Sequence, residues 1–298
     1  MNLRRKNILL LASALLAGMG LLASLAYAEK SGAPSKEVVM NSPVKRNAFV
    51  EIGESPESWV NRYGKQVDIN AKNHGLKFYS LDWPTKNPGQ LTVKNGPSEF
   101  LLDATLGAMG TFDDEYPAEG FSKILITAGV SAEERISHDE ARQKIFALLR
   151  KIQNAGWRHW IYPGDPRLSG EDSFRYQIAE DDTFYSLDPN YLPPMSVWMK
   201  LSDRSQWKFY SNGVQMSVRF SRDQDRMKPD SPGSYIVWLE LQSRNELERG
   251  EFQEGERARW KILYPEIRKK RLSERANQEK KLQALGYKID IKYKNPDE

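Results

Sequence analysis

The chain has 298 residues, of which 39% are hydrophobic, 28% charged and 11% aromatic. That is enough apolar material for a buried core, so the composition excludes a wholly disordered chain and, at about 150 residues per domain, suggests two domains. The absence of cysteine excludes a disulfide framework, a thiolate metal site, a cysteine nucleophile and a lipoprotein anchor.

The charge balance argues against a nucleic-acid partner. The net charge is +4, from 44 basic and 40 acidic residues, and Arg4, Arg5 and Lys6 lie in a 28-residue segment that contains no acid. Subtracting these three charges leaves +1 for the rest of the chain, whereas a nucleic-acid-binding protein usually carries a strong basic excess. We therefore expect no nucleic-acid partner.

Residues 1–28 have the pattern of a secretory signal. Three cations precede an uncharged run from Ile8 to Ala28, and Ala26-Tyr27-Ala28 fits a cleavage site of the A-x-A type. The run has 21 residues, close to the ~20 that span a bilayer, so an uncleaved signal anchor that contacts the membrane through residues 8–28 stays open. Both interpretations place the rest of the chain in the periplasm, or anchored in the inner membrane and facing the periplasm.

A tether and a first α+β module are expected next. Residues 29–54 contain Gly, Ser and Pro and favour a flexible tether. The module covers residues 55–165. Its clearest helix begins at Ser137, where Ser137-x-x-Glu140 forms a capping box, and ends before Gly156. A second helix begins at Ser55-Pro56. Strands are expected at 76–83, 90–94, 98–106, 121–127 and 157–162, with a turn at Asn95-Gly96.

A Pro-rich connecting segment, 166–194, leads to a second module over residues 195–298. Asn212-Gly213 between alternating runs predicts a type I′ hairpin, which pairs Ser211 with Val214, Phe209 with Met216 and Trp207 with Val218. Only one face of this hairpin is apolar, so we expect its sheet to be covered on one side. Further strands are expected at 197–201, 235–241 and 287–291, and a charged helix at 266–285.

The two halves share one order of elements: strands with an Asn-Gly turn, an apolar strand, a helix, a Gly-aromatic pair and a last strand. The sequence therefore predicts an α+β fold with two similar β-β-β-α-β-like modules and antiparallel sheets, preceded by the N-terminal signal or anchor. The alternative is two ordinary α+β segments with a coincidental order.

No motif carries a defined chemistry. We expect His138 to be solvated in the first helical turn, His159 to serve packing, and His74 to be exposed. There is no His-x-x-x-His pair, Walker loop or Gly-x-Ser-x-Gly, and Ser42-x-x-Lys45 lies in the tether. We therefore predict no catalytic, cofactor-binding or metal-binding residue, and no cofactor.

Two kinds of charge cluster have alternative interpretations. Asp113-Asp114-Glu115 and Glu180-Asp181-Asp182 are most simply solvated loops, although paired carboxylates also serve glycoside hydrolysis. The basic run Arg268–Arg271 is most simply a solvated helix with ion pairs, and its alternative is contact with anionic lipid headgroups or an acidic partner.

A group of aromatic and arginine side chains follows the first long helix. Trp, Tyr and Arg dominate the hot spots of protein interfaces, and core packing is the alternative use of the same residues. The candidates for partner binding are Trp157, Arg158, Trp160, Tyr162, Arg167, Arg175 and Tyr176.

Location and the absence of a catalytic motif together favour a binding protein over an enzyme. The sequence predicts a non-enzymatic bacterial envelope protein that binds an envelope or secreted protein, either as an inhibitor of the immunity type or as an accessory factor for secretion or assembly. The alternative is a hydrolase of cell-wall or carbohydrate substrates that uses carboxylates of the acidic loops.

Overall fold

The computed structural model describes residues 46–71 and 75–297. The predicted signal or anchor, residues 29–45 of the tether, and His74 lie outside the described residues. Residues 47–51 were predicted as tether, but they form strand β1.

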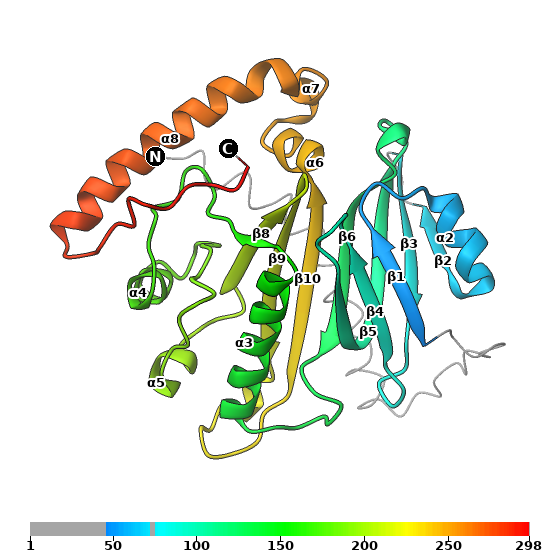
Figure 1. The fold of residues 1–298 in the computed structure, drawn as a ribbon, viewed down its shortest axis with the longest axis horizontal. Helices are drawn as coiled ribbons and strands as arrows, with labels where there is room; N and C mark the ends of the chain where they lie inside the picture. The colour runs from blue at the N-terminus through cyan, green and yellow to red at the C-terminus, as the bar shows by residue number, and fades with distance from the viewer. Residues whose placement is uncertain (1–45, 72–74, 298) are drawn as a thin grey trace. The chain divides into compact units, whose positions relative to one another are not determined.

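One ten-stranded sheet contains strands from both predicted modules (Figure 1). The main order is β1-β4-β5-β6-β10-β9-β8-β7, while β3 pairs with β5 and β2 pairs with β3. Among the strand pairs of the described residues, β1 and β4 are parallel and the other pairs are antiparallel. The strands are β1 Asn47–Glu51, β2 Asp68–Ala71, β3 Leu76–Asp82, β4 Gly89–Lys94, β5 Phe100–Asp113, β6 Phe121–Gly129, β7 Arg158–His159, β8 Gln206–Ser211, β9 Val214–Arg222 and β10 Tyr235–Ser243.

Helices accompany this sheet, so the α+β prediction is confirmed. Ser137 caps α3 as predicted, because its hydroxyl accepts a hydrogen bond from the Glu140 N–H at 3.1 Å. Ser55 caps α2 in the same way. The α-helices are α2 Pro56–Tyr63, α3 His138–Asn154, α4 Glu171–Ala179, α5 Met195–Trp198, α6 Arg244–Arg249, α7 Glu254–Arg257 and α8 Trp260–Ala284; short 3₁₀ helices lie at Gly64–Gln66, Pro117–Glu119 and Gln224–Arg226.

The β8–β9 hairpin has the predicted register. Ser211 pairs with Val214, Phe209 with Met216, and Trp207 with Val218. The expectation that one face stays open was wrong. Trp207 packs against Phe146 of α3 on the apolar face, but Tyr210 on the other face is also buried.

Three predicted strands differ from the structure. Residues 195–198 form helix α5 instead of starting a strand at 197. The strand predicted at 157–162 is reduced to the two residues of β7. At 287–291 only Ile289 makes a bridge, to Leu168. Helix α8 also begins six residues earlier than predicted, at Trp260, and includes Pro265 in its second turn.

Strand β5 changes partner halfway along its length. Residues 100–105 pair with β4 and residues 107–113 with β3. Ala104 between them has a positive φ of 54°, an uncommon conformation for a residue with a Cβ. Because of this irregularity, residues 100–105 run in a different direction from residues 107–113 and lie against α3. Leu101 of β5 and Leu148 of α3 line one groove there.

The buried apolar residues form two clusters. The larger joins the sheet to α2, α3 and α5, with Trp59, Trp157, Trp198 and Trp207 among its largest members. The smaller lies beneath α8 and comprises Ile161, Leu168, Tyr176, Tyr185 and Leu282. The connecting segment 166–194 therefore packs against the body through side chains such as Phe174 and Tyr185.

Candidate functional site

The seven predicted interface residues lie in segment 157–176, and five of them contact helix α8 or the tail after it: Trp160, Tyr162, Arg167, Arg175 and Tyr176. Trp157 is buried in the larger core, and its indole N–H donates to the carbonyl of Ser98 at 3.1 Å. Trp160 is also buried, and its N–H donates to Asp297 near the end of the chain at 3.2 Å. Arg158 is exposed. Whether these residues bind a partner stays a prediction, but the tryptophans clearly contribute to internal packing.

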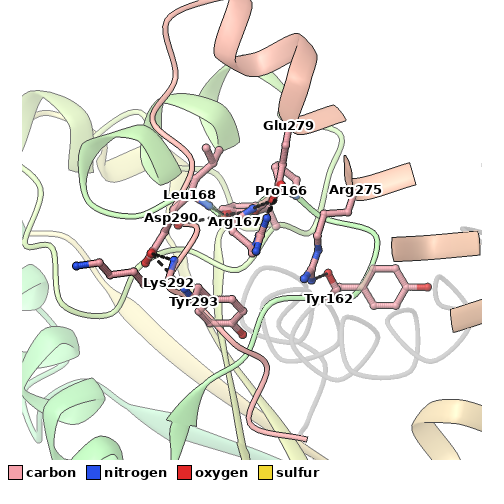
Figure 2. Close-up of polar contacts among 10 residues, drawn as sticks. Tyr162, Pro166, Arg167, Leu168, Arg275, Glu279, Asp290, Lys292 and Tyr293 are labelled. Atoms are coloured by element: carbon pink, nitrogen blue, oxygen red, sulfur yellow. Dashed lines mark hydrogen bonds and ion pairs between the residues drawn. The ribbon is translucent and has the colours of Figure 1, made fainter. Parts of the chain in front are cut away.

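Arg167 attaches this segment to α8 through an arginine–carboxylate pair (Figure 2). Its Nε and Nη2 donate to the carboxylate of Glu279 at 2.8 and 2.7 Å, and its backbone N–H donates to the same group at 3.0 Å. Burial alone would raise the pKa of Glu279, but the hydrogen bonds from Arg167 outweigh it and hold that pKa below its usual value. Glu279 is therefore a charged anchor for the helix at neutral pH.

Arg275 makes a second attachment, one turn earlier on α8. Its Nη2 donates to the backbone carbonyls of Ile161 at 3.3 Å and Tyr162 at 2.8 Å (Figure 2). Arg275 is buried and its guanidinium bonds carbonyls that no strand pairs. This contact replaces the ladder hydrogen bonds that a longer β7 would have made.

The tail after α8 closes the junction from the other side. The backbone N–H of Asp290 donates to the carbonyl of Arg167 at 2.8 Å. The hydroxyl of Tyr293 accepts from the Ile161 N–H at 2.7 Å and donates to the His159 carbonyl at 3.2 Å. The tail thus covers the edge of the sheet at β7.

The remaining tyrosines and Arg175 also bind within the chain. Tyr162 donates its hydroxyl to Glu251 at 2.6 Å, and burial together with Glu251 raises the pKa of Tyr162, so it stays a neutral donor. The hydroxyl of Tyr176 lies 2.5 Å from the amide of Gln278 on α8. The guanidinium of Arg175 lies 3.8 Å from the ring centre of Tyr287.

The basic run of α8 divides between two faces. Arg268 pairs with Asp297 at 3.2 Å, and Arg271 pairs with Glu251 at 3.1 Å, so both arginines face the body. Lys269 and Lys270 are exposed. The contact with anionic lipid proposed from sequence near Arg268–Arg271 therefore rests on the lysines of that run.

A groove lies between α3 and the start of β5. Its cavity volume is about 260 Å³. Apolar side chains form most of its wall, and Lys144, Lys151 and Asp103 stand at its rim; the apolar members are Leu101, Leu102, Val130, Ile145, Ala147, Leu148 and Val237. No sequence motif predicted this groove, because its walls come from segments that are far apart in the sequence: residues 101–103, 129–130, 144–151 and 237. The exposed Leu101 is its only local signal.

Both described histidines are internal. The expectation that His138 is solvated was wrong: it is buried, its Nδ1 lies 2.5 Å from the Tyr235 hydroxyl, and burial lowers its pKa. His159 is a packing residue, as expected, and its Nε2 lies 3.0 Å from the hydroxyl of Ser186. Ser186 is fully buried, so this Ser–His pair has no access for a substrate.

The acidic loops are mostly engaged in surface pairs. Asp114 pairs with Lys77 at 2.7 Å and Asp182 with Arg204 at 2.5 Å, while Asp181 accepts from Ser202 at 2.7 Å. Asp113 is buried, contrary to the solvated loop expected, because its carboxylate accepts from the Glu115 N–H within a turn. Within residues 46–71 and 75–297 no cluster of His, Asp and Glu has the arrangement of a metal site.

Comparison of the chain with family models, with curated proteins and with solved structures found no match. In the part of the chain that the structure describes, no helix combines the length and the apolar character needed to cross a bilayer. The site must therefore be interpreted from its own geometry.

Proposed function

We propose that this chain is a non-enzymatic envelope protein, periplasmic or anchored in the inner membrane, and that it binds a protein partner through the groove between α3 and β5. An inhibitor of the immunity type and an accessory factor for secretion or assembly both fit this proposal. The observation that carries it is an apolar groove that includes the exposed side chain of Leu101 and has Lys144, Lys151 and Asp103 at its rim.

The size of the groove favours a protein side chain over a small ligand. Small-molecule pockets usually measure roughly 300–1,000 Å³, whereas this cavity measures about 260 Å³. It has room for one or two side chains, which is how an anchor residue of a partner fits into a pocket at the centre of an interface.

The rim favours a partner with acidic side chains beside that anchor. Lys144 and Lys151 have 42% and 44% of their side chains exposed, and their carboxylate neighbours, Glu140 and Asp103, lie 3.2 and 3.7 Å away. Exposed pairs of this kind contribute little to stability. A carboxylate of the partner can therefore replace Glu140 and Asp103 as the ion-pair partner of the two lysines at a low cost in free energy.

A matched pair of substitutions tests the groove. Leu101 and Val60 are both 37% exposed, but Val60 lies on α2, outside the groove. In crosslinked affinity capture of the full chain from its native envelope, we expect Leu101→Glu to abolish recovery of the main protein partner. Val60→Glu should leave recovery unchanged. Equal recovery with both variants, or no protein partner with the unmodified chain, contradicts the proposal.

We also propose that the two halves arose by duplication. The strand order β4-β5-β6 is followed by its reverse, β10-β9-β8, and β6 pairs with β10 in antiparallel orientation. This arrangement is what an approximate two-fold axis between β6 and β10 would produce. In addition, Gly156 and Gly286 follow α3 and α8 with φ of 96° and 82°. Superposition of β4–β6 and α3 on β8–β10 and α8 tests this proposal, which fails if the strands cannot be matched in that order.

A further inference from the structure

The charge of this protein is separated along the chain. Residues 257–298 contain 13 Lys and Arg against 6 Asp and Glu, a net of +7. Residues 29–256 contain 28 against 34, a net of −6. The net charge of +4 for the whole chain therefore combines an acidic body with a basic C-terminal part. Most of that basic part is α8 and its tail.

Within α8 the two kinds of cation have different neighbours. Arg268, Arg271 and Arg275 bind acidic side chains or backbone carbonyls of the body. The lysines of α8 are exposed, and no carboxylate among the described residues lies within 4.0 Å of any of them. These lysines are Lys261, Lys269, Lys270, Lys280 and Lys281. The arginines hold the helix in place, and the lysines leave a cationic outer surface.

Helical geometry groups these lysines with an exposed aliphatic residue. At 3.6 residues per turn, Ile262, Lys269 and Lys280 fall within about 20° of one line along the helix, opposite Arg271. Lys270 and Lys281 follow a second line about 100° away. We define the outer face of α8 by these residues: Ile262, Lys269, Lys270, Lys280 and Lys281. The exposed Glu266 falls between the two lines, so the four lysines and this one carboxylate give the face a net charge of +3.

The most exposed aliphatic side chains lie near the two ends of α8 and in the tail after it. Among the described residues, the three most exposed large hydrophobic side chains are Ile262, Leu285 and Ile291, with 73%, 72% and 75% of their surface accessible. All three belong to α8 or to the tail after it. Exposed lysines beside an anionic bilayer bind its phosphates through their ammonium groups, and an aliphatic side chain next to them can enter the acyl boundary.

We propose that the outer face of α8 lies on the anionic headgroups of a phospholipid bilayer. The net −6 of residues 29–256 is repelled by an anionic surface, so the field of the protein turns α8 toward it. An acidic protein is the alternative occupant, and the response to a soluble acidic polymer in the test below distinguishes it from a bilayer.

The absence of cysteine makes a site-specific test straightforward. The full chain with Ile262→Cys is labelled with an environment-sensitive fluorophore and mixed with vesicles of phosphatidylcholine alone or with phosphatidylglycerol. We expect a blue shift only on vesicles that contain phosphatidylglycerol, reversed by high salt. The fluorophore at position 262 reports the surroundings of α8 itself, and residues 1–28 are the same in every variant compared.

Two charge-matched variants supply the control. Lys269→Glu with Lys280→Glu removes two lysines of the outer face, whereas Lys65→Glu with Lys86→Glu makes the same change of net charge at exposed positions elsewhere. Because each lysine near an anionic membrane strengthens binding about fivefold, the first variant should need at least about 25-fold more anionic lipid and the second little more than the unmodified chain. An equal shift on neutral vesicles, an equal loss in both variants, or a response only to a soluble acidic polymer overturns the proposal.

Discussion

The side-chain amide of Asn212 donates a hydrogen bond of 2.9 Å to the backbone carbonyl of Asn95, which lies 117 residues earlier in the chain. In return, the amide of Asn95 donates to the carbonyl of Ser211 at 2.8 Å. Two hairpin turns, one from each half of the protein, are therefore joined directly.

We expect Asn95→Ala to lower the free energy of unfolding by about 0.5–1.5 kcal/mol, because Asn95 is buried and the substitution removes its hydrogen bond to the Ser211 carbonyl. Asn212→Gly keeps the positive φ of the turn and removes only the second bond. Urea denaturation of both single variants and the double variant measures the coupling. If the two losses of unfolding free energy simply add in the double variant, the two hydrogen bonds do not strengthen each other.

Stability should fall with acid through His159. Burial lowers the pKa of His159 to about 4, against the opposing charge of Asp188, whereas the unfolded value is near 6.5. Above pH 6.5 the ring is neutral in both states and contributes no pH dependence. Between pH 6.5 and about 4 the unfolded chain binds a proton that the folded chain does not, so this group removes up to about 1.4 kcal/mol per pH unit.

Urea denaturation of the unmodified protein and of His159→Gln from pH 7.5 to 4.5 tests this contribution. The difference between the two unfolding free energies should change across that range, with the unmodified protein losing more stability. His138, whose pKa burial also lowers, is present in both proteins and cancels in the comparison. Parallel curves would contradict the prediction.

The attachment of α8 depends on Glu279. Glu279→Gln keeps an oxygen acceptor for Arg167 but removes the charge from a buried site, so we expect a loss of about 2 kcal/mol of stability and faster hydrogen exchange in α8. Asp182→Asn is the control, because Asp182 makes a shorter ion pair, at 2.5 Å, with a side chain that is 99% exposed. That variant should differ from the unmodified protein by less than about 1 kcal/mol. The reverse ranking would show that distance, and not burial, decides the strength of these pairs.

Tyrosine hydroxyls cap both ends of the main strand order. Tyr63 accepts from the N–H of Phe49 and donates to its carbonyl, both at 2.9 Å, at the β1 edge. Tyr293 bonds the backbone of Ile161 and His159 in the same manner beside β7. An exposed strand edge is a template for pairing with another chain, and a side chain that occupies its hydrogen-bonding groups prevents this.

We therefore expect Tyr63→Phe and Tyr293→Phe to lose about 1–3 kcal/mol of stability and to self-associate as concentration rises. Analytical ultracentrifugation measures the association. Tyr79→Phe, on the internal strand β3, is the control and should remain at the size of the unmodified protein. If the two edge variants show no concentration dependence, the hydroxyls do not protect the edges.

Short-range sequence patterns correctly predicted the elements that are stabilised by residues close together in the sequence. Ser137 and Glu140 are three residues apart, and the cap between them forms as expected. The register of Phe209 with Met216 follows from a two-residue turn that only residues tolerant of positive φ can occupy. In both cases the interacting groups are close in sequence, so little chain entropy opposes them.

Long-range packing decided the features that the sequence misplaced. The sequence predicted His138 as a solvated residue of a first helical turn. In the structure it is buried and contacts the hydroxyl of Tyr235, which lies 97 residues later. The polar face of β8 is covered because segment 160–162 lies over Lys208, whose ammonium is 5.8 Å from the ring centre of Trp160. Residues 287–291 lack a strand partner and bind instead through side chains and single backbone bonds.

The outer face of α8 and the groove beside α3 also depend partly on local sequence and partly on tertiary contacts. The sequence alone revealed the basic run of α8 and the α+β class, because charge and periodicity are properties of the residues themselves. Only the tertiary structure separated the arginines that hold α8 from the lysines on its outer face, and only it brought Leu101 and Leu148 into one groove. The physical reason is that burial and pairing depend on which distant segments come together, and contacts between such segments are absent from any local pattern.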